Sequence, residues 1–295
     1  MAIKSYSKNF IGVLPEVYKK RAYFLEVFGT VQAVDGVSDN ENYLILKTED
    51  QDVVIQTYDT GTNVGFGTGT GKTSRFGNRR EIKSKTTTVP YEKPLAIHEG
   101  IDKMTVNDKF DEQIAKRSIK HAEAWTENVS QMLADNLIKE GTDIQKDSIT
   151  FKEIDEAFNQ VSKEYVNLGV DTTHTWLVYV TPDVYQALVD SDKLTSVKGS
   201  TVNLDRNEVN MYKGFVIFNT PDRFFADTPE AKSGRKAHMI FSVSGIGKVG
   251  VGVSTYRAID SEDFDGVAIQ SSAKYGKYIP EDNKKVVKVV TTASE

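Results

Sequence analysis

The strongest pattern of hydrophobic and polar positions covers residues 107–140 and has the period of an α-helix. Thr105 precedes the pattern with Asp108 three positions later, and Gly141 follows it, as is typical of helix boundaries. The pattern predicts one helix of about 50 Å, longer than a compact domain of this size needs. We expect it to lie along a plate-like sheet. Its apolar face consists of Phe110, Ile114, Trp125, Val129, Met132 and Leu137.

Two shorter helices are predicted after it. Thr150 and Glu153 have the spacing of a capping box, which predicts a helix over residues 150–169. Pro182 is at the position where a helix tolerates proline, and it predicts a short helix that ends at residue 189.

Runs of β-branched and aromatic residues predict strands between and after these helices. Alternation over residues 256–278 predicts a hairpin that turns at Asp265 and Gly266. Residues 191–210 are polar and typical of a loop. Helices and strands do not alternate regularly, which indicates the α+β class. The predicted strands cover residues 176–180, 215–218, 239–241, 248–253 and 284–292.

Residues 52–89 differ from the rest of the chain because they contain six closely spaced glycines and few apolar side chains. Glycine loses the most backbone entropy on ordering, so such a stretch does not build a core. Residues 53–55 and 86–89 resemble strands. We therefore expect a projecting two-stranded arm with a flexible tip, and an isolated hairpin of this kind has to rest on another surface.

Charge divides this region into an acidic part and a basic part. Residues 35–59 carry seven acids and Lys47, a net charge of −6, and residues 72–85 carry six bases and Glu81, a net charge of +5. Such polarity favours docking onto a complementary neighbour; two solvated loop faces are the alternative. The candidate contact residues are Asp50, Asp52, Asp59, Lys72, Arg75, Arg79, Arg80, Lys83 and Lys85.

The first thirty residues leave two interpretations open. Val17, Phe24 and Phe28 share one face of a possible helix over residues 16–28. The segment is either a short amphipathic arm that packs on something else or the first helix of the core.

Composition narrows the functional classes. The chain has 295 residues, a net charge of −5 and no cysteine, which excludes disulfides, thiolate nucleophiles and cysteine-ligated metals. The acidic balance argues against a dedicated nucleic-acid binder. We expect no transmembrane helix and no secretory signal, because no long apolar run is present.

The motifs that resemble chemical sites are incomplete. Gly71, Lys72 and Thr73 end a sequence like a phosphate-binding loop, but Phe66 stands where the first glycine belongs and no apolar helix follows. Ser244 lacks the leading glycine of a nucleophile elbow. The acidic run at residues 260–265 lacks calcium-loop spacing and is typical of a solvated hairpin tip. The four histidines are far apart, and we expect His121 to pack against Trp125; they are His98, His121, His174 and His238. We therefore predict no catalytic site, no cofactor and no metal.

The order of these elements resembles the major capsid protein of tailed bacteriophages, which has the Hong Kong 97-type fold. The resemblance covers nearly the whole chain and is carried by loose local patterns as well as by architecture. These are residues 180–188 (VTPDVYQAL), 212–217 (YKGFVI), 267–270 (VAIQ) and 284–289 (KKVVKV).

This resemblance implies an α+β capsid fold with an N-arm, an extended β-hairpin loop, a long spine helix, and peripheral and axial domains. Lys198, Asp205 and Arg206 are candidate contacts in the axial loops. The implied divisions are 1–30 as N-terminal arm, 31–51 as first part of the peripheral domain, 52–97 as extended loop, 98–142 as peripheral domain with spine helix, 143–250 as axial domain, 251–281 as peripheral hairpin, and 282–295 as last axial strand and tail.

Two departures from family members matter. Only about thirty residues precede the arm-like part, so assembly is expected to use a separate scaffold protein or none. Some members join subunits by a lysine–asparagine bond, but residues 256–278 contain no asparagine, so a covalent crosslink is not expected.

The resemblance implies a structural protein that is made in the host bacterial cytoplasm and ends up in the virion. It would form the hexamers and pentamers of an icosahedral shell that encloses double-stranded DNA, with a portal protein as a further partner and no membrane contact. One alternative is an encapsulin, a bacterial protein shell of the same fold. A remote alternative is a nucleotide-binding enzyme that uses Lys72 and Thr73.

Overall fold

The structure is a computed structural model, and it divides into two compact units. The main unit comprises residues 1–38 and 92–295, and the arm unit comprises residues 39–91. The two are described separately. The described residues are 22–33, 42–49, 55–61, 75–76, 81–82, 84–104, 110–171, 173–191, 201–203, 208–225 and 235–293.

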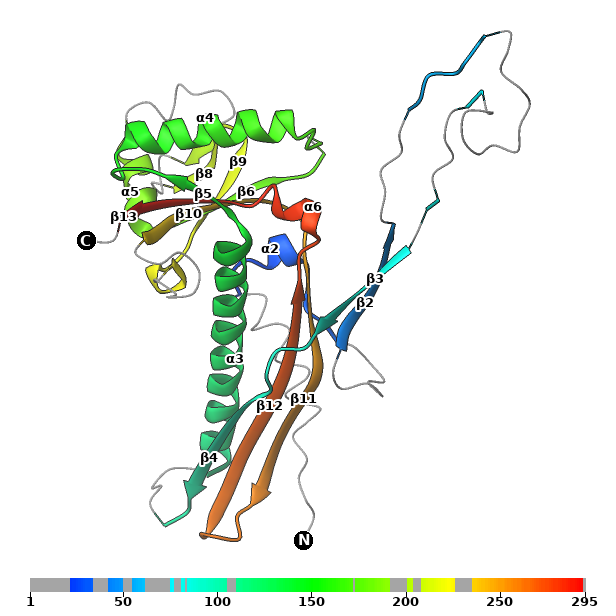
Figure 1. The fold of residues 1–295 in the computed structure, drawn as a ribbon. Coiled ribbons are helices and arrows are strands. Elements are labelled where there is room, and N and C mark those ends of the chain that lie inside the picture. The colour runs from blue at the N-terminus through cyan, green and yellow to red at the C-terminus, as the bar shows by residue number, and fades with distance from the viewer. Residues whose placement is uncertain are drawn as a thin grey trace. The chain divides into compact units, whose positions relative to one another are not determined.

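A four-stranded sheet lies beside the long helix α3 (Phe110–Glu140) in the main unit (Figure 1). At 1.5 Å per residue, the 31 residues of α3 extend about 46 Å. β1 is parallel to its neighbour, and the other pairs are antiparallel. The strand order is β1 (Gln32–Ala33), β11 (Lys248–Asp260), β12 (Gly266–Tyr278) and β4 (Leu95–Asp102).

A seven-stranded mixed sheet forms the rest of the main unit, and α4 (Phe151–Asn167) covers one of its faces (Figure 1). Two of its pairs are parallel, β5 with β13 and β6 with β9. The shorter helices are α2 (Leu25–Phe28), α5 (Pro182–Val189), the 3-10 helix η3 (Asp222–Phe225) and α6 (Glu281–Lys284). The strand order is β5 (Thr142–Gln145), β13 (Lys288–Ala293), β10 (Arg235–Val243), β6 (Trp176–Val180), β9 (Phe215–Asn219), β8 (Glu208–Tyr212) and β7 (Thr201–Asn203).

The apolar stripe of α3 belongs to a core that both sheets share. Leu133 and Leu137 of the helix are fully buried in the same cluster as Tyr179 of the seven-stranded sheet and Tyr275 of the four-stranded sheet. A second core lies under α4, where Phe158 meets the rings of the seven-stranded sheet edge to face. The α+β class is therefore confirmed, and so is the long helix, whose residues 105–109 lie outside the described part.

Residues 22–30 are part of the core of the main unit. Phe24, Val27 and Phe28 are buried there, and the Phe24 ring lies 4.4 Å from that of Tyr179, centre to centre. Phe24 has the left-handed backbone conformation (φ 68°) that side chains rarely adopt, and the surrounding aromatic contacts hold it. Of the two interpretations of the N-terminal segment, the core one holds for these residues.

The helix starts differ in detail from the predicted caps. Helix α4 begins after Thr150 as expected, but the Thr150 side chain makes no capping hydrogen bond. The Glu153 carboxylate instead accepts hydrogen bonds from the N–H and the hydroxyl of Ser148, both at 2.9 Å. The capping-box prediction is therefore wrong in its partner, because a residue two positions earlier offers both donors to the same carboxylate. Thr181 likewise makes no side-chain cap for α5.

Three strand predictions need correction. Strand β11 runs unbroken from Lys248 to Asp260 with a bulge between Val251 and Val253, so a domain boundary at residue 250 would cut through a strand. The last strand, β13, starts only at Lys288, because α6 and a turn occupy the start of the predicted range. The predicted loop at residues 191–210 contains β7 and the start of β8, which pair with each other.

The arm unit contains a two-stranded antiparallel sheet of β2 (Asn42–Glu49) and β3 (Ser84–Pro90). The strand at residues 86–89 was predicted, but its partner was not: Ile45 pairs with Thr88, and Ile55 lies outside any strand. The range 52–97 predicted for the extended loop overlaps both units, because β4, from Leu95, belongs to the main unit.

We expect Phe24→Ala to destabilise the main unit by about 3–5 kcal/mol, because it removes a buried ring from the shared core. The free energy of unfolding of unassembled subunits, from urea titration, measures the change. Val166→Ala on α4 is the control: Val166 is 67% exposed, and its truncation should cost less than about 0.5 kcal/mol. Equal stability of the Phe24→Ala variant and the parent chain would contradict the placement of this segment in the core.

Candidate assembly surface

The described part of the arm unit has almost no core of its own. Tyr43 is the one large hydrophobic residue buried among its described residues, and its ring lies 5.7 Å from that of Tyr91. Burial, and secondarily the Tyr91 charge, raises the pKa of Tyr43, and burial raises the pKa of Tyr91. Both phenols therefore stay neutral at physiological pH and serve as packing groups.

Large apolar side chains of the arm unit face solvent instead. Ile55 is 96% exposed, Phe76 is 76% exposed and Ile82 is 70% exposed, and Ile45 and Tyr58 are exposed as well. Full burial of one such side chain contributes roughly 1.5–3 kcal/mol. The arm unit therefore has an apolar surface that a partner can cover, although single exposed residues elsewhere are ordinary.

The two chain segments of the arm unit also contact each other outside the β2–β3 pair, at residues 58–59 and 75–76. Asp59 donates its N–H to the Arg75 carbonyl at 2.9 Å, and the Arg75 guanidinium donates to the Asp59 carbonyl at 3.3 Å. The rings of Tyr58 and Phe76 meet edge to face at 5.1 Å. Two hydrogen bonds and one aromatic contact therefore connect residues 58–59 to residues 75–76 in the arm unit.

The structure brings together two of the residues predicted from charge. Asp59 and Arg75 are the pair just described, and Lys85 is in β3, opposite Thr48. The sequence predicted a strand at Ile55 and gave no indication that Ile45, Ile55 and Ile82 are exposed. Outside the described residues lie Asp50, Asp52, Lys72, Arg79, Arg80, Lys83, Lys198, Asp205 and Arg206, together with the glycine-rich motif that contains Thr73.

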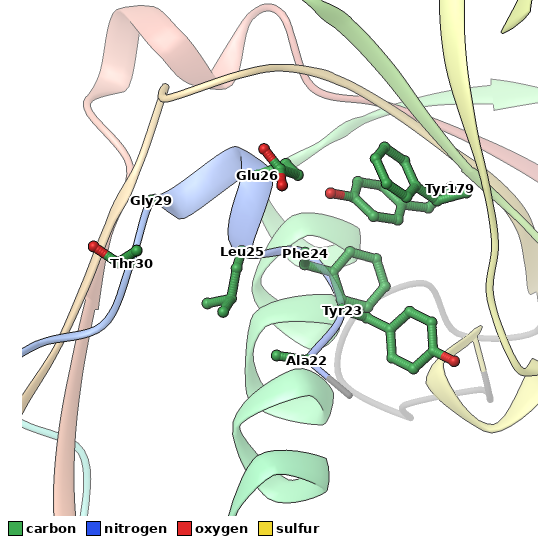
Figure 2. Close-up of a pocket in the computed structure, with 9 residues that line it drawn as sticks. Ala22, Tyr23, Phe24, Leu25, Glu26, Gly29, Thr30 and Tyr179 are labelled. Atoms are coloured by element: carbon green, nitrogen blue, oxygen red, sulfur yellow. The ribbon is translucent and has the colours of Figure 1, made fainter. Parts of the chain in front are cut away.

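A pocket of about 540 Å³ lies beside α2 in the main unit (Figure 2). Its walls are aromatic, from Tyr23, Phe24, Tyr179 and Phe218, and Glu26 supplies its carboxylate. Burial raises the pKa of Tyr179 well above its usual value, with the Glu26 charge as a smaller cause. The pocket offers apolar contact surface but no group of residues suited to acid–base catalysis.

A buried polar cluster connects α3 to the four-stranded sheet. His121 of α3 contacts the Ser271 hydroxyl through Nδ1 at 3.0 Å and the Glu99 carboxylate through Nε2 at 3.1 Å. Trp125 donates its indole N–H to the same Ser271 oxygen at 3.0 Å. Arg117 binds both carboxylate oxygens of Glu99, at 2.8 and 2.6 Å. His121 was predicted to pack against Trp125. The structure shows that the two side chains share a hydrogen-bond partner, the hydroxyl of Ser271.

Ser271, His121 and Glu99 follow one another in the order of the catalytic triad of hydrolases. The question is therefore whether Ser271 can act as a nucleophile. A nucleophile has to reach a substrate, and Ser271 is only 3% exposed. Its oxygen already accepts from Trp125, and Ser271 lines neither the pocket beside α2 nor the one beside Glu92 and Tyr275. The arrangement holds a helix on a sheet, with every ring nitrogen of His121 in contact with a partner.

The electrostatics of Glu99 follow from this cluster. Burial alone would raise the pKa of its carboxyl, but the hydrogen bonds from His121 and Arg117 and their charges outweigh it and hold the pKa below the usual 4.5. Within the described residues, no group of acids and histidines has the arrangement of a metal site, and no helix is long and apolar enough to span a bilayer.

We expect Glu99→Gln to lower the free energy of unfolding by about 1–3 kcal/mol near pH 7, since charge-assisted hydrogen bonds are lost. A depressed carboxyl pKa stabilises the fold above the ordinary value near 4.5, and that contribution disappears as the pH falls through the depressed value. Urea titrations between pH 3 and 7 should therefore give a flatter pH profile for the variant.

The control for this prediction is Glu92→Gln. Glu92 forms a half-exposed pair with Lys277 at 3.1 Å, and exposed pairs contribute about 0–1 kcal/mol. A Glu99→Gln profile as steep as that of the control would contradict the role of Glu99.

Comparison with known proteins gives matches at the level of structure only. No protein-family model and no curated protein sequence matches the chain. The capsid of Cyanophage P-SCSP1u matches with a TM-score of 0.66 and 13% identity, over 93% of this chain and 89% of that chain. The mature capsid of bacteriophage PhiM1 matches with a TM-score of 0.63 and 15% identity, over 92% and 88%.

A structure from Mycobacterium phage Che8 agrees with these, with a TM-score of 0.60 and 16% identity over 84% of both chains. At such identities the likeness is one of fold. The predicted architecture is confirmed by these matches: the chain has the Hong Kong 97-type fold of phage capsids, with its long helix, mixed sheets and extended two-stranded arm.

Proposed function

We propose that this chain is a major capsid protein, the structural subunit of an icosahedral phage head. The observation that carries the proposal is the combination of a phage-capsid fold with an arm unit that exposes its apolar side chains. A fold by itself does not define a function. The arm unit provides the second argument for assembly, because its exposed apolar side chains would be buried by a neighbouring copy.

The physical argument for assembly compares the apolar side chains that each unit buries. The main unit contains three buried apolar clusters, but the described arm residues include only Tyr43 as a large buried hydrophobic. Two-stranded sheets are marginally stable in water without further packing. Contacts with neighbouring copies would supply the missing burial, and a shell repeats every such contact many times.

Within this proposal, the peripheral domain consists of α3 with the four-stranded sheet, and the axial domain consists of the seven-stranded sheet with α4 and α5. Because β11 is continuous from Lys248, we propose an axial-to-peripheral boundary at residue 247 in place of 250, and we assign the extended loop to residues 39–91, the range of the arm unit. The axial domains would meet around the hexamer and pentamer axes.

The further parts of the proposal concern partners and place. The shell would enclose double-stranded DNA without reading its sequence, and a portal protein and a separate scaffold protein would take part in assembly. The subunit would be made in the bacterial cytoplasm and reside in the virion. Its role would be structural, without catalysis, which agrees with the buried position of Ser271 beside His121.

Electron microscopy of the expressed chain tests the proposal. We expect closed shells with hexameric and pentameric units, alone or together with the scaffold protein of the same virus. Virions isolated from the host should contain this chain and packaged DNA. Shells that contain a cargo enzyme and no genome would overturn the phage assignment in favour of an encapsulin, and a permanently monomeric chain would overturn assembly itself.

The basic leg of the arm gives a second test. We expect the double variant Arg79→Glu and Arg80→Glu to reduce particle yield at least about tenfold while leaving the subunit folded, because like charges across an interface cost several kcal/mol. Particle counts by electron microscopy and urea unfolding of the subunit measure the two effects. The control, Lys152→Glu with Lys163→Glu, makes the same change of charge on exposed positions of α4. Normal particle yield from the Arg79 and Arg80 variant would contradict docking through this leg.

A further inference from the structure

The pocket beside α2 contains a polar group without a partner among the described residues. The Tyr179 hydroxyl is buried and makes no hydrogen bond with any of them, and Tyr179 as a whole is 1% exposed. Tyr179 lines the pocket, and Figure 2 shows its hydroxyl directed toward Glu26. A buried hydroxyl that is not hydrogen-bonded is unfavourable and uncommon in folded proteins. The hydroxyl therefore indicates that the pocket takes a ligand that can form this hydrogen bond.

Glu26 adds a negative charge at the same place. It is exposed, it lines the pocket, and its carboxylate forms no ion pair with a described residue. Burial, and to a smaller extent the charge of Glu26, raises the pKa of Tyr179, so the carboxylate and the hydroxyl are close to each other. A carboxylate only accepts hydrogen bonds, and a phenol oxygen accepts them as well. The two groups together therefore select a hydrogen-bond donor with a positive charge.

The walls of the pocket suit the apolar part of such a ligand. Tyr23, Phe24 and Phe218 contribute rings beside that of Tyr179, and Phe218 stacks on Tyr179 with ring centres 5.0 Å apart. Aromatic faces attract cations, most often arginine, whose planar guanidinium stacks on a ring while it donates several hydrogen bonds. The volume of about 540 Å³ is in the range of ligand-binding pockets. An arginine side chain with an apolar neighbour fits this combination of walls and charge.

Backbone hydrogen bonds fix the wall that residues 23–26 provide. The Tyr23 N–H donates to the Ser130 hydroxyl of α3 at 3.1 Å. The Gly245 N–H donates to the Glu26 carbonyl at 3.0 Å, which connects this wall to the turn before β11. Because the protein itself holds these groups in place, little ordering cost opposes binding.

The arginines of this chain already have partners, which points to a different protein as the source of the ligand. Five arginines lie among the described residues, and each contacts a group of its own chain. A second copy would have to break such a contact in order to fill the pocket. The contacts are Arg75 with the Asp59 carbonyl, Arg117 with Glu99, Arg223 with Glu127, Arg235 with Asp143 and Arg257 with Gln270.

We propose that the pocket beside α2 binds an arginine side chain, flanked by an apolar residue, on a segment of a partner protein. The guanidinium contacts the Glu26 carboxylate and the Tyr179 hydroxyl, and the apolar neighbour packs on Tyr23 and Phe218. The proposal goes beyond the shell function, because the site belongs to a single subunit and its test does not require assembly.

Peptide binding to the full-length, unassembled subunit tests the proposal. The probe is a capped tripeptide of leucine, arginine and leucine, and its matched control contains citrulline, the uncharged analogue of arginine. Isothermal titration calorimetry measures both affinities. We expect saturable binding of the arginine peptide to one site per subunit and at least about tenfold weaker binding of the control. Absence of arginine-peptide binding up to about 5 mM, or equal binding of the two peptides, would overturn the proposal.

Two substitutions locate the site. Glu26→Gln should weaken peptide binding at least about tenfold. The control, Glu262→Gln, makes the same change on the exposed turn between β11 and β12 and should leave binding unchanged. Tyr179→Phe should weaken binding at least about threefold without lowering the urea midpoint of the subunit, because the lost hydroxyl has no partner among the described residues. A clear fall in that midpoint, or binding that is insensitive to Glu26→Gln, would overturn the proposal.

Other occupants of the pocket give different results. Arginine amide that binds as tightly as the peptide would overturn the protein partner in favour of a small organic cation. Subunits that bind no peptide but associate with each other, in a way that Glu26→Gln abolishes, would overturn it in favour of a second copy. These measurements use unassembled subunits, so this proposal and the shell proposal can fail independently.

Discussion

The burial of one stripe of α3 is the constraint on which the main unit depends. Leu133 and Leu137 of this helix are fully buried in a cluster that includes Tyr179 from one sheet and Tyr275 from the other. Both sheets contribute apolar side chains to this core, and α3 is the helix that contacts both of them. Residues 22–30 close the same core, and the orientation of the two sheets therefore follows from how α3 is packed.

Apolar contacts alone do not fix the position of a long helix along a sheet. The cluster of Glu99, Arg117 and His121 adds directional contacts: the histidine reaches a serine of β12 and a carboxylate of β4 from adjacent strands. A shift of α3 by one turn would leave the His121 ring buried without partners, which costs more than the hydrogen bonds contribute. The polar cluster therefore selects one register for a helix that the apolar core stabilises.

The sequence pattern predicted the elements whose formation depends on residues close together in the chain. The helical period marked α3, and the β-branched and aromatic run at residues 176–180 marked β6, because burial of one face leaves a periodic trace in the sequence. The strand predicted at residues 248–253 covers only the first half of β11, which continues past a bulge between Val251 and Val253 to Asp260. No spacing could have joined His121 to Ser271, 150 positions away. The exposed isoleucines of the arm left no such trace for a related reason: none of them is buried against a neighbour within the described residues.

The division of burial between the two units has a consequence for assembly. The buried apolar clusters of the main unit include no arm residue, so in the proposed assembly the free energies of folding and of association would reside largely in different residues. In the proposed assembly, a subunit folds first and associates later through its charged arm with exposed apolar side chains. Contacts that are weak individually would dissociate and re-form while such a lattice grows, and the proposed shell would be stable because every copy repeats them. The opposed charges of residues 35–59 and 72–85 fit this order of events, since they favour one way of docking without tightening each contact greatly.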